Sequence, residues 1–249
     1  MSEVLLEAQG VSRAFLGFVA LEDANLTVNA GEIVGLIGPN GAGKSTFFNC
    51  VAGDLAPSRG RIRFDGVDVT RLSPEQHARL GIGRTFQVPA AFEDMTLLEN
   101  VMVGSFLRER QARVARDHAH EMLRLAGLER LAGQRARTLG TPGRKRLEIA
   151  RVLATGPRLI LLDEALAGLT PIEIQQAIEL VRTIHAMNVT LIIVEHIMEV
   201  IRTLAHRVLV FNHGRTIAQG TPQAVMEDPT VVEAYLGHRR QRRRGRSAT

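Results

Sequence analysis

The chain has 249 residues, of which 45% are hydrophobic and 23% charged, so it can form a large α/β domain and is neither disordered nor fibrous in composition. Its net charge of +5 falls to 5 − 6 = −1 without the six arginines after His238, so we expect residues 238–249 to be a basic, disordered tail. Such a tail can also favour anionic lipid or nucleic acid. No apolar run approaches the roughly 20 residues of a membrane helix, and the acidic start argues against a secretory signal. The single cysteine excludes an internal disulfide and fits a reducing cytoplasm.

The first sixty or so residues predict strands around one glycine-rich loop. Residues 19–28 alternate loosely and predict a strand before a turn, and residues 32–38 form an apolar run that predicts a buried strand entering a loop. A helix is predicted over 44–53, closed by its terminal glycine. Residues 61–69 predict two strands joined by a turn at Asp65–Gly66.

From about residue 96 to residue 155 strand-like runs vanish and Leu, Ala, Arg and Glu dominate. Residues 100–128 have helical spacing and reach a glycine near their end. We therefore expect a helical subdomain, residues 88–156, inserted in the core. The pattern then alternates, with strands predicted at 158–165, 189–196 and 207–214 and helices at 172–187 and 197–205. Alternating strands and helices predict a βα sheet with helices on its faces.

The segment GPNGAGKST satisfies the pattern G-x-x-x-x-G-K-[ST] between an apolar strand and a helix. Its glycines let backbone N–H groups surround a phosphate chain, and the helix that follows presents its positive end. We expect Lys44 to reach the β- and γ-phosphates and Ser45 to hold Mg²⁺. The predicted nucleotide-binding residues of this loop are Gly38, Pro39, Asn40, Gly41, Ala42, Gly43, Lys44, Ser45 and Thr46.

Two carboxylates end the apolar run LILLDE. A carboxylate at Asp163 can hold the magnesium shell, and a second one at Glu164 can polarise an attacking water. The alternative, an ordinary acidic strand end at the surface, is common for an Asp-Glu pair that stands alone.

The order of GPNGAGKST, RTFQ, LEIARVLATGPRLILLDEALAGLTP and IIVEH resembles the ATPase subunits of ABC transporters over residues 4–237. The segments VEHIMEVI and GTPQAVMEDPTVVEAYLG resemble the branch that serves branched-chain amino acid importers. The resemblance implies one ABC ATPase domain over residues 1–237. It implies a P-loop NTPase core with a mixed β-sheet flanked by helices, an antiparallel β edge and the helical insert. The implied activity is ATP hydrolysis with ATP and Mg²⁺, coupled to transport.

The resemblance also implies roles for matching residues. Gln87 matches a glutamine that contacts Mg²⁺ and links the site to the helical insert, and His196 matches a histidine that approaches the γ-phosphate. Phe15 matches an aromatic that stacks on adenine, with Phe18 and simple core packing as alternatives.

The sequence departs from the family at the signature, usually LSGGQ, which aligns with Leu139, Gly140, Thr141, Pro142 and Gly143. Gly140 lacks the serine hydroxyl, and Pro142 has no backbone N–H. In the family this segment completes the partner subunit's site, so the loss weakens that site rather than this chain's own. Thr170 of the D-loop replaces Asp or Asn and can hydrogen-bond without carrying charge.

The implied partners are two membrane permeases, a second related ATPase and, indirectly, an external solute-binding protein, with no nucleic acid. A heterodimer of ATPases is favoured over a homodimer, because a partner with a normal signature would give one good site. The implied location is the cytoplasmic face of the membrane, held peripherally. The alternatives are a lipopolysaccharide-type export ATPase, a soluble ABC ATPase, and a nucleotide-binding subunit with little turnover. The solute is not encoded in this chain.

Overall fold

The computed structural model describes residues 3–87 and 89–235, which fall into two compact units. Unit 1 comprises residues 3–29, 33–71 and 196–235, and unit 2 comprises residues 30–32 and 72–195 without residue 88. The predicted basic tail, 238–249, lies outside the described residues.

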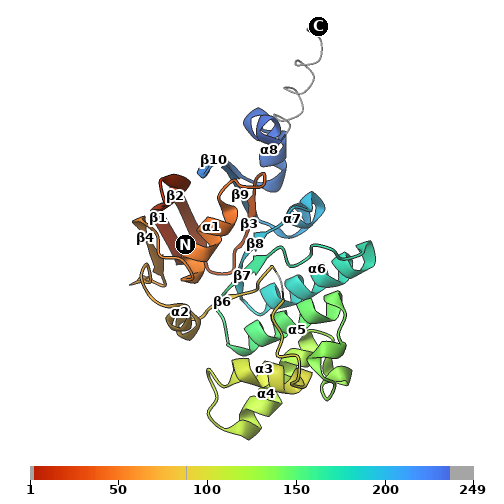
Figure 1. Cartoon of the computed structure of the whole chain (residues 1–249). Coiled ribbons are helices and arrows are strands. Elements are labelled where there is room, and N and C mark those ends of the chain that lie inside the picture. Colours follow the sequence, from red (N-terminus) through yellow and green to blue (C-terminus); the bar gives the residue numbers. More distant parts are fainter. Residues whose placement is uncertain (1–2, 88, 236–249) are drawn as a thin grey trace. The chain divides into compact units, whose positions relative to one another are not determined.

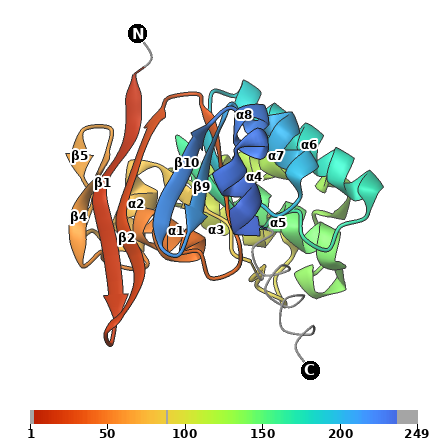
Figure 2. The same cartoon turned by 90° about the horizontal axis from the view of Figure 1, so that it is seen from above.

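Unit 1 contains an antiparallel sheet with the strand order β2-β1-β4-β5, whose neighbouring strands are visible in Figure 2. This sheet is the predicted antiparallel edge. A second group of strands is mixed, because β9 pairs with β3 in parallel and with β10 antiparallel. The strands are β1 Val4–Phe15, β2 Phe18–Asn29, β3 Ile33–Ile37, β4 Arg59–Phe64, β5 Val67–Asp68, β9 Arg207–Asn212 and β10 Arg215–Gly220.

The helices of unit 1 include α1 Lys44–Ala52, α7 Met198–Leu204 and α8 Pro222–Glu227. Helix α1 ends as predicted, because Gly53 adopts the left-handed conformation that favours glycine. A further helical stretch covers residues 229–235.

Unit 2 contains three parallel strands in the order β8-β7-β6, namely β6 Ile82–Arg84, β7 Leu159–Asp163 and β8 Thr190–Val194. Every residue of β7 and β8 is buried. Continuous apolar runs of this length are typical of parallel strands that are covered on both faces. The carboxyl end of β7 therefore brings Asp163 to the edge of a buried layer, where a ligand site is expected in α/β sheets.

The helices of unit 2 are α2 Pro74–Leu80, α3 Leu97–Ser105, α4 Ala112–Leu125, α5 Thr141–Ala154 and α6 Pro171–Ala186, with short 3₁₀ turns at Glu129–Leu131 and Ala136–Thr138. Helices α3, α4 and α5 pack on one another (Figure 1). They lie within the predicted insert, although its limits, 88–156, stay a prediction. No described helix is long and apolar enough to cross a membrane.

The helical pattern predicted over residues 100–128 is divided in two by a break between α3 and α4. The break lets α4 fold back on α3 and α5. Gly104 near the end of α3 shows how close this packing is, because a Cβ there would lie 2.4 Å from the backbone oxygen of Arg151 in α5. The periodicity gave the helical character correctly, whereas tertiary packing decided where the helix breaks.

Candidate functional site

The predicted site residues fall into two groups, one in each unit. Unit 1 holds the glycine-rich loop, both candidate phenylalanines and His196, which is exposed just after Glu195. Unit 2 holds Gln87, Asp163, Glu164, the signature and Thr170.

The glycine-rich loop joins β3 to α1, as the motif requires. Helix α1 begins at Lys44, and its N-cap, Gly43, offers no side chain to the first N–H groups of the helix. Uncapped N–H groups at the positive end of a helix are well suited to bind phosphate.

Two of the loop glycines are also required by packing within unit 1. Gly38 has φ +146°, and a Cβ there would lie 2.1 Å from the backbone oxygen of Phe211 in β9. Gly43 has φ +100°, and its Cβ would lie 2.7 Å from the backbone oxygen of Ala20 in β2. Real Cβ atoms do not approach backbone oxygens so closely, so the close packing of the loop explains these glycines independently of any ligand.

The ammonium of Lys44 lies within its own loop. Its Nζ donates to the backbone oxygens of Gly38 at 2.7 Å and of Pro39 at 3.0 Å, and the residue is buried. These bonds hold the loop around a positive charge, which suits a phosphate chain.

Phe15 and Phe18 lie opposite each other where β1 turns into β2. Both rings are exposed, by 41% and 68%, so neither packs in the core. The guanidinium of Arg13 lies 4.8 Å from the centroid of the Phe15 ring. An exposed ring on a strand end can stack on a base, and the choice between the two phenylalanines stays a prediction.

Tyr235 is a contact of the loop that the sequence did not indicate. Partial burial raises the pKa of its hydroxyl, and a hydrogen bond with the backbone of Gly38 opposes that rise. The last described helical stretch thus touches the first glycine of the loop.

In unit 2, the end of β7 and the end of β6 meet in a cluster of polar side chains. Asp163 is buried and paired with Arg84, whose Nη2 lies 3.2 Å from Oδ2 of Asp163. Gln87 donates from Nε2 to Oε2 of Glu164 at 2.8 Å. The predicted glutamine and the predicted catalytic carboxylate are therefore in direct contact.

The residues predicted to hold Mg²⁺ offer oxygen donors, namely the Ser45 hydroxyl, the Gln87 amide oxygen and the Asp163 carboxylate. Hard oxygen donors are what Mg²⁺ prefers, so the donor set fits the ion. The guanidinium of Arg84 also contacts the Asp163 carboxylate, so the charge of this buried group is compensated by a neighbouring cation.

Three buried charged residues of this cluster were not predicted: Lys145, Glu148 and Glu195. Burial lowers the pKa of Lys145, and the carboxylates of Glu195, Glu148 and Glu164 oppose that shift. Burial raises the pKa of Glu148, opposed first by the hydrogen bond from the Phe86 N–H. Lys145 and Glu148 lie on helix α5 and Glu195 follows strand β8, and charged residues usually face solvent, so the sequence carried no signal of these contacts.

The signature segment forms the start of α5. Gly140 is the N-cap and offers no side-chain hydrogen bond, and Thr141, Pro142 and Gly143 form the first turn. Thr170 instead caps α6, because its hydroxyl accepts from the N–H of Glu173 at 3.4 Å and donates to the Glu173 carboxylate at 2.8 Å. This capping box gives Thr170 a structural role, which Asp or Asn would also fill.

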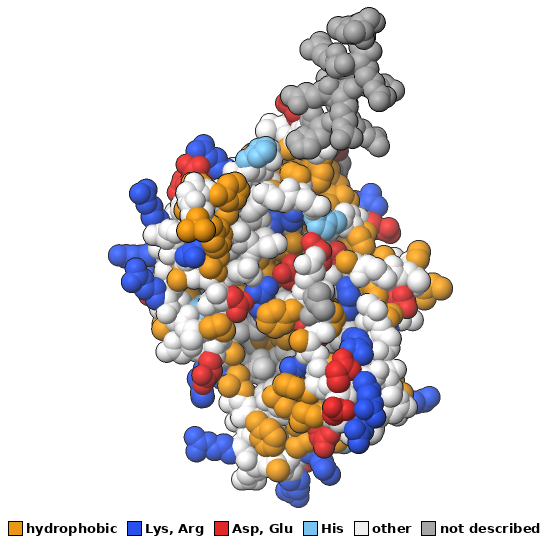
Figure 3. All heavy atoms as spheres, viewed as in Figure 1, with side chains coloured by type: hydrophobic (Ala, Val, Ile, Leu, Met, Phe, Trp, Pro, Cys, Tyr) orange, Lys and Arg blue, Asp and Glu red, His pale blue; other side chains and the backbone are white. Residues whose placement is uncertain are grey.

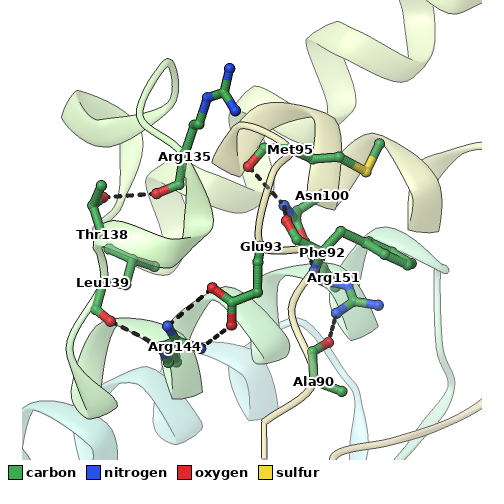
Figure 4. A network of polar contacts seen from close by, with 10 residues as sticks. All are labelled: Ala90, Phe92, Glu93, Met95, Asn100, Arg135, Thr138, Leu139, Arg144 and Arg151. Atoms are coloured by element: carbon green, nitrogen blue, oxygen red, sulfur yellow. Dashed lines mark hydrogen bonds and ion pairs between the residues drawn. The ribbon is translucent and has the colours of Figure 1, made fainter.

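Helix α5 also holds the segment that follows Gln87 (Figure 4). Arg144 donates to the backbone oxygen of Leu139 at 2.9 Å and pairs with the carboxylate of Glu93. Arg151, two turns further along α5, donates to the backbone oxygen of Ala90. The signature helix and the segment after Gln87 are thus tied at two points.

Exposed aromatic and aliphatic side chains occur near helix α3 of unit 2. Orange side chains gather in Figure 3 over the region where Figure 1 places α3. Val103 lies in α3 and Phe106 directly follows it, and both side chains are exposed, as is Phe92. Exposed apolar side chains that gather on one face of a folded protein are typical of a protein contact.

Two family models match the chain. The model described as "ABC transporter" covers residues 21–167, and the model described as "Branched-chain amino acid ATP-binding cassette transporter" covers residues 215–240.

Among curated proteins, the chain is 37% identical to the high-affinity branched-chain amino acid transport ATP-binding protein BraF of Pseudomonas aeruginosa, over 95% of the chain and 99% of the relative. It is 37% identical to LivG of Escherichia coli with the same coverage, and 34% identical to the lipopolysaccharide export ATP-binding protein LptB of Acidithiobacillus ferridurans, over 95% and 98%. Among solved structures, an ATP-binding cassette of an ABC transporter in its ADP conformation superposes with a TM-score of 0.86 at 30% identity, covering 95% of this chain and all of that one.

Proposed function

Since the chain belongs to the ABC transporter family as an ATP-binding, ATP-hydrolysing and energy-coupling subunit, we propose that it powers the import of branched-chain or related amino acids. The observation that carries this proposal is 37% identity over 95% of the chain to two ATPases named for branched-chain amino acid transport. The C-terminal match to the branched-chain model adds support. Lipopolysaccharide export remains the second candidate, because a relative of that type is 34% identical.

We assign the nucleotide contacts to the loop Gly38–Thr46, with the Lys44 ammonium on the phosphates and Phe15 or Phe18 on the adenine. The Ser45, Gln87 and Asp163 oxygens would hold Mg²⁺, which when bound neutralises charge on the phosphate oxygens.

Glu164 is the general base of this proposal. Its Oε2 already accepts a hydrogen bond from Gln87 Nε2, so the carboxylate is oriented before a substrate arrives. It would take the proton of the attacking water, while His196 would stabilise charge on the γ-phosphate.

The partners proposed are two membrane permeases, reached from the cytoplasmic face of the membrane, and a second ATPase related to this chain. The exposed apolar side chains over α3 suit a contact with a permease. The weakened signature favours a heterodimer, in which the partner supplies a complete signature to this chain's loop.

The test is transport in cells that lack the gene and carry the wild type or Glu164→Gln. We expect uptake of radiolabelled leucine, isoleucine or valine to be restored by the wild type and not by the variant. Normal amino acid uptake in the deletion strain, together with loss of lipopolysaccharide from the cell surface, would favour the export function instead.

A further inference from the structure

We infer that Lys145 and Glu148 of helix α5 are positioning residues for catalysis, Lys145 for Glu164 and Glu148 for Gln87. The inference rests on the proposed role of Glu164 as the base. Neither residue touches the expected reacting atoms, so each would act through the group that it holds.

Lys145 holds the turn that begins at the candidate base. Its Nζ donates to the backbone oxygen of Glu164 at 3.1 Å and to that of Ala167 at 2.7 Å. These two residues are the ends of one tight turn, because the Ala167 N–H donates to the Glu164 oxygen at 3.2 Å. A single buried ammonium thus bridges both ends of the turn.

The turn needs such support because Glu164 has a conformation that side-chain-bearing residues rarely adopt, with φ +47°. A residue of this kind persists only where its surroundings determine its conformation. The N–H of Glu164 donates to the Val194 oxygen at 2.9 Å, and Lys145 holds its carbonyl oxygen. The carboxylate of Glu195 holds the turn as well, because it accepts a hydrogen bond from the N–H of Leu166, a residue of this turn, at 2.8 Å.

Glu148 lies one turn along α5 from Lys145 and holds the residue before Gln87. Its Oε1 accepts from the Phe86 N–H at 2.9 Å, and the carboxylate is buried. Because Phe86 is covalently joined to Gln87, this bond limits where the glutamine side chain can reach.

The contacts form a closed ring. Lys145 is hydrogen-bonded to Glu164, and Glu164 to Gln87 at 2.8 Å. Gln87 is joined by a peptide bond to Phe86, which is hydrogen-bonded to Glu148 on the same helix as Lys145. Since the same helix begins with the signature, the ring joins the signature of this chain to its own catalytic carboxylate. A misplacement of about 1 Å at a reacting group can lower a rate on the order of 100-fold, so loosening the ring should be visible in kcat.

The experiment compares full-length variants in the transporter purified through a tag on this chain. We expect Lys145→Met and Glu148→Leu to lower kcat for ATP by about 10- to 100-fold, with the Kd for ATP within about twofold of wild type, because the loop that binds phosphate is untouched. Lys145→Arg and Glu148→Gln should restore most of the rate, since they keep the donors and the acceptor oxygen. Arg182→Met on α6 is the matched control, an exposed cation paired with Glu179.

A second measurement separates positioning from general damage. If Lys145 acts through Glu164, then Lys145→Met in the Glu164→Gln background should cost nothing further, because effects that act through one group are not additive. Should Lys145→Met fail to fold, Lys145→Gln, which keeps one donor, should show an intermediate kcat. Normal kcat in Lys145→Met, or an unrestored rate in Lys145→Arg, would overturn the inference while Glu164→Gln remained inactive. Wild-type turnover by Glu164→Gln would instead overturn the proposed base itself.

Discussion

The weakened signature in the first turn of α5 can be tested by restoring one missing backbone N–H group, that of residue 142. The N–H of Arg144 already bonds to the Gly140 oxygen at 3.0 Å, so the first-turn donors are those of residues 141–143. Pro142 removes one of these three, because proline has no N–H. Pro142→Ala restores that donor, and its helical φ is one that alanine adopts without strain.

The expected gain follows from what a lost donor costs. One preorganised N–H aimed at transition-state charge is worth about 100- to 1000-fold in rate, or roughly 3 to 4 kcal/mol. Gly140→Ser would add the missing hydroxyl. The backbone of Gly140 is extended, and the nearest atom to an added Cβ, Cδ of Pro142, lies 3.9 Å away, so a serine fits without displacing its neighbours.

The assay isolates the site that this signature completes. In the purified transporter, we expect Glu164→Gln to silence this chain's own site and to leave a small ATP turnover from the partner's site. In that background we expect Pro142→Ala to raise the remaining rate by on the order of 100-fold, and Gly140→Ser to raise it further. Pro74→Ala, in the first turn of α2, is the control and should change nothing.

A remaining rate unchanged by Pro142→Ala, in a complex that still binds ATP, would refute the role assigned to Pro142. About half of the wild-type turnover remaining in Glu164→Gln would also refute it, since both sites would then be equally active. Fast, cooperative hydrolysis by the chain purified without partners would contradict both the weak signature and the heterodimer.

Three further predictions concern the loop, the adenine contact and the tail. Lys44→Ala removes a buried ammonium that holds two loop carbonyls, so calorimetry should show that ATP binding or turnover is lost, and tight binding with full transport would contradict this. Whichever of Phe15→Ala and Phe18→Ala removes the stacking ring should weaken ATP affinity by about 1 kcal/mol, roughly fivefold, in a fluorescence titration, and two unaffected variants would exclude both rings. Deleting residues 238–249 should leave the thermal unfolding midpoint and ATPase rate unchanged, and loss of membrane association at ordinary salt would reveal a lipid contact instead.

Much of the candidate site could be proposed from the sequence because its main part is local. The glycine-rich loop, the strand before it and the helix after it are contiguous in the chain, so residues 32–53 contain the whole unit. The same holds for the end of β7, where an apolar run leads directly to Asp163 and Glu164. Patterns that depend only on residues close together in the chain can be interpreted without knowledge of the tertiary structure.

The tertiary structure decided whatever depends on distant residues. The sequence motif predicts Gly38 as a phosphate contact. The structure adds a second reason for glycine there, because a side chain would collide with the backbone of Phe211, more than 170 residues later in the chain. The break between α3 and α4 follows from the packing of α3 on α5, which helical periodicity does not contain.

The charges of α5 show the difference most clearly. The segment RKRLEIAR carries four cations and one carboxylate in eight residues, and the ordinary expectation is that they face water. The fold instead buries Lys145 and Glu148 and aims them at the turn after β7 and at the residue before Gln87. A buried charge is stable only when partners from other elements satisfy it, and those partners are brought within hydrogen-bond distance only by the packing of α5 on the ends of β6 and β7.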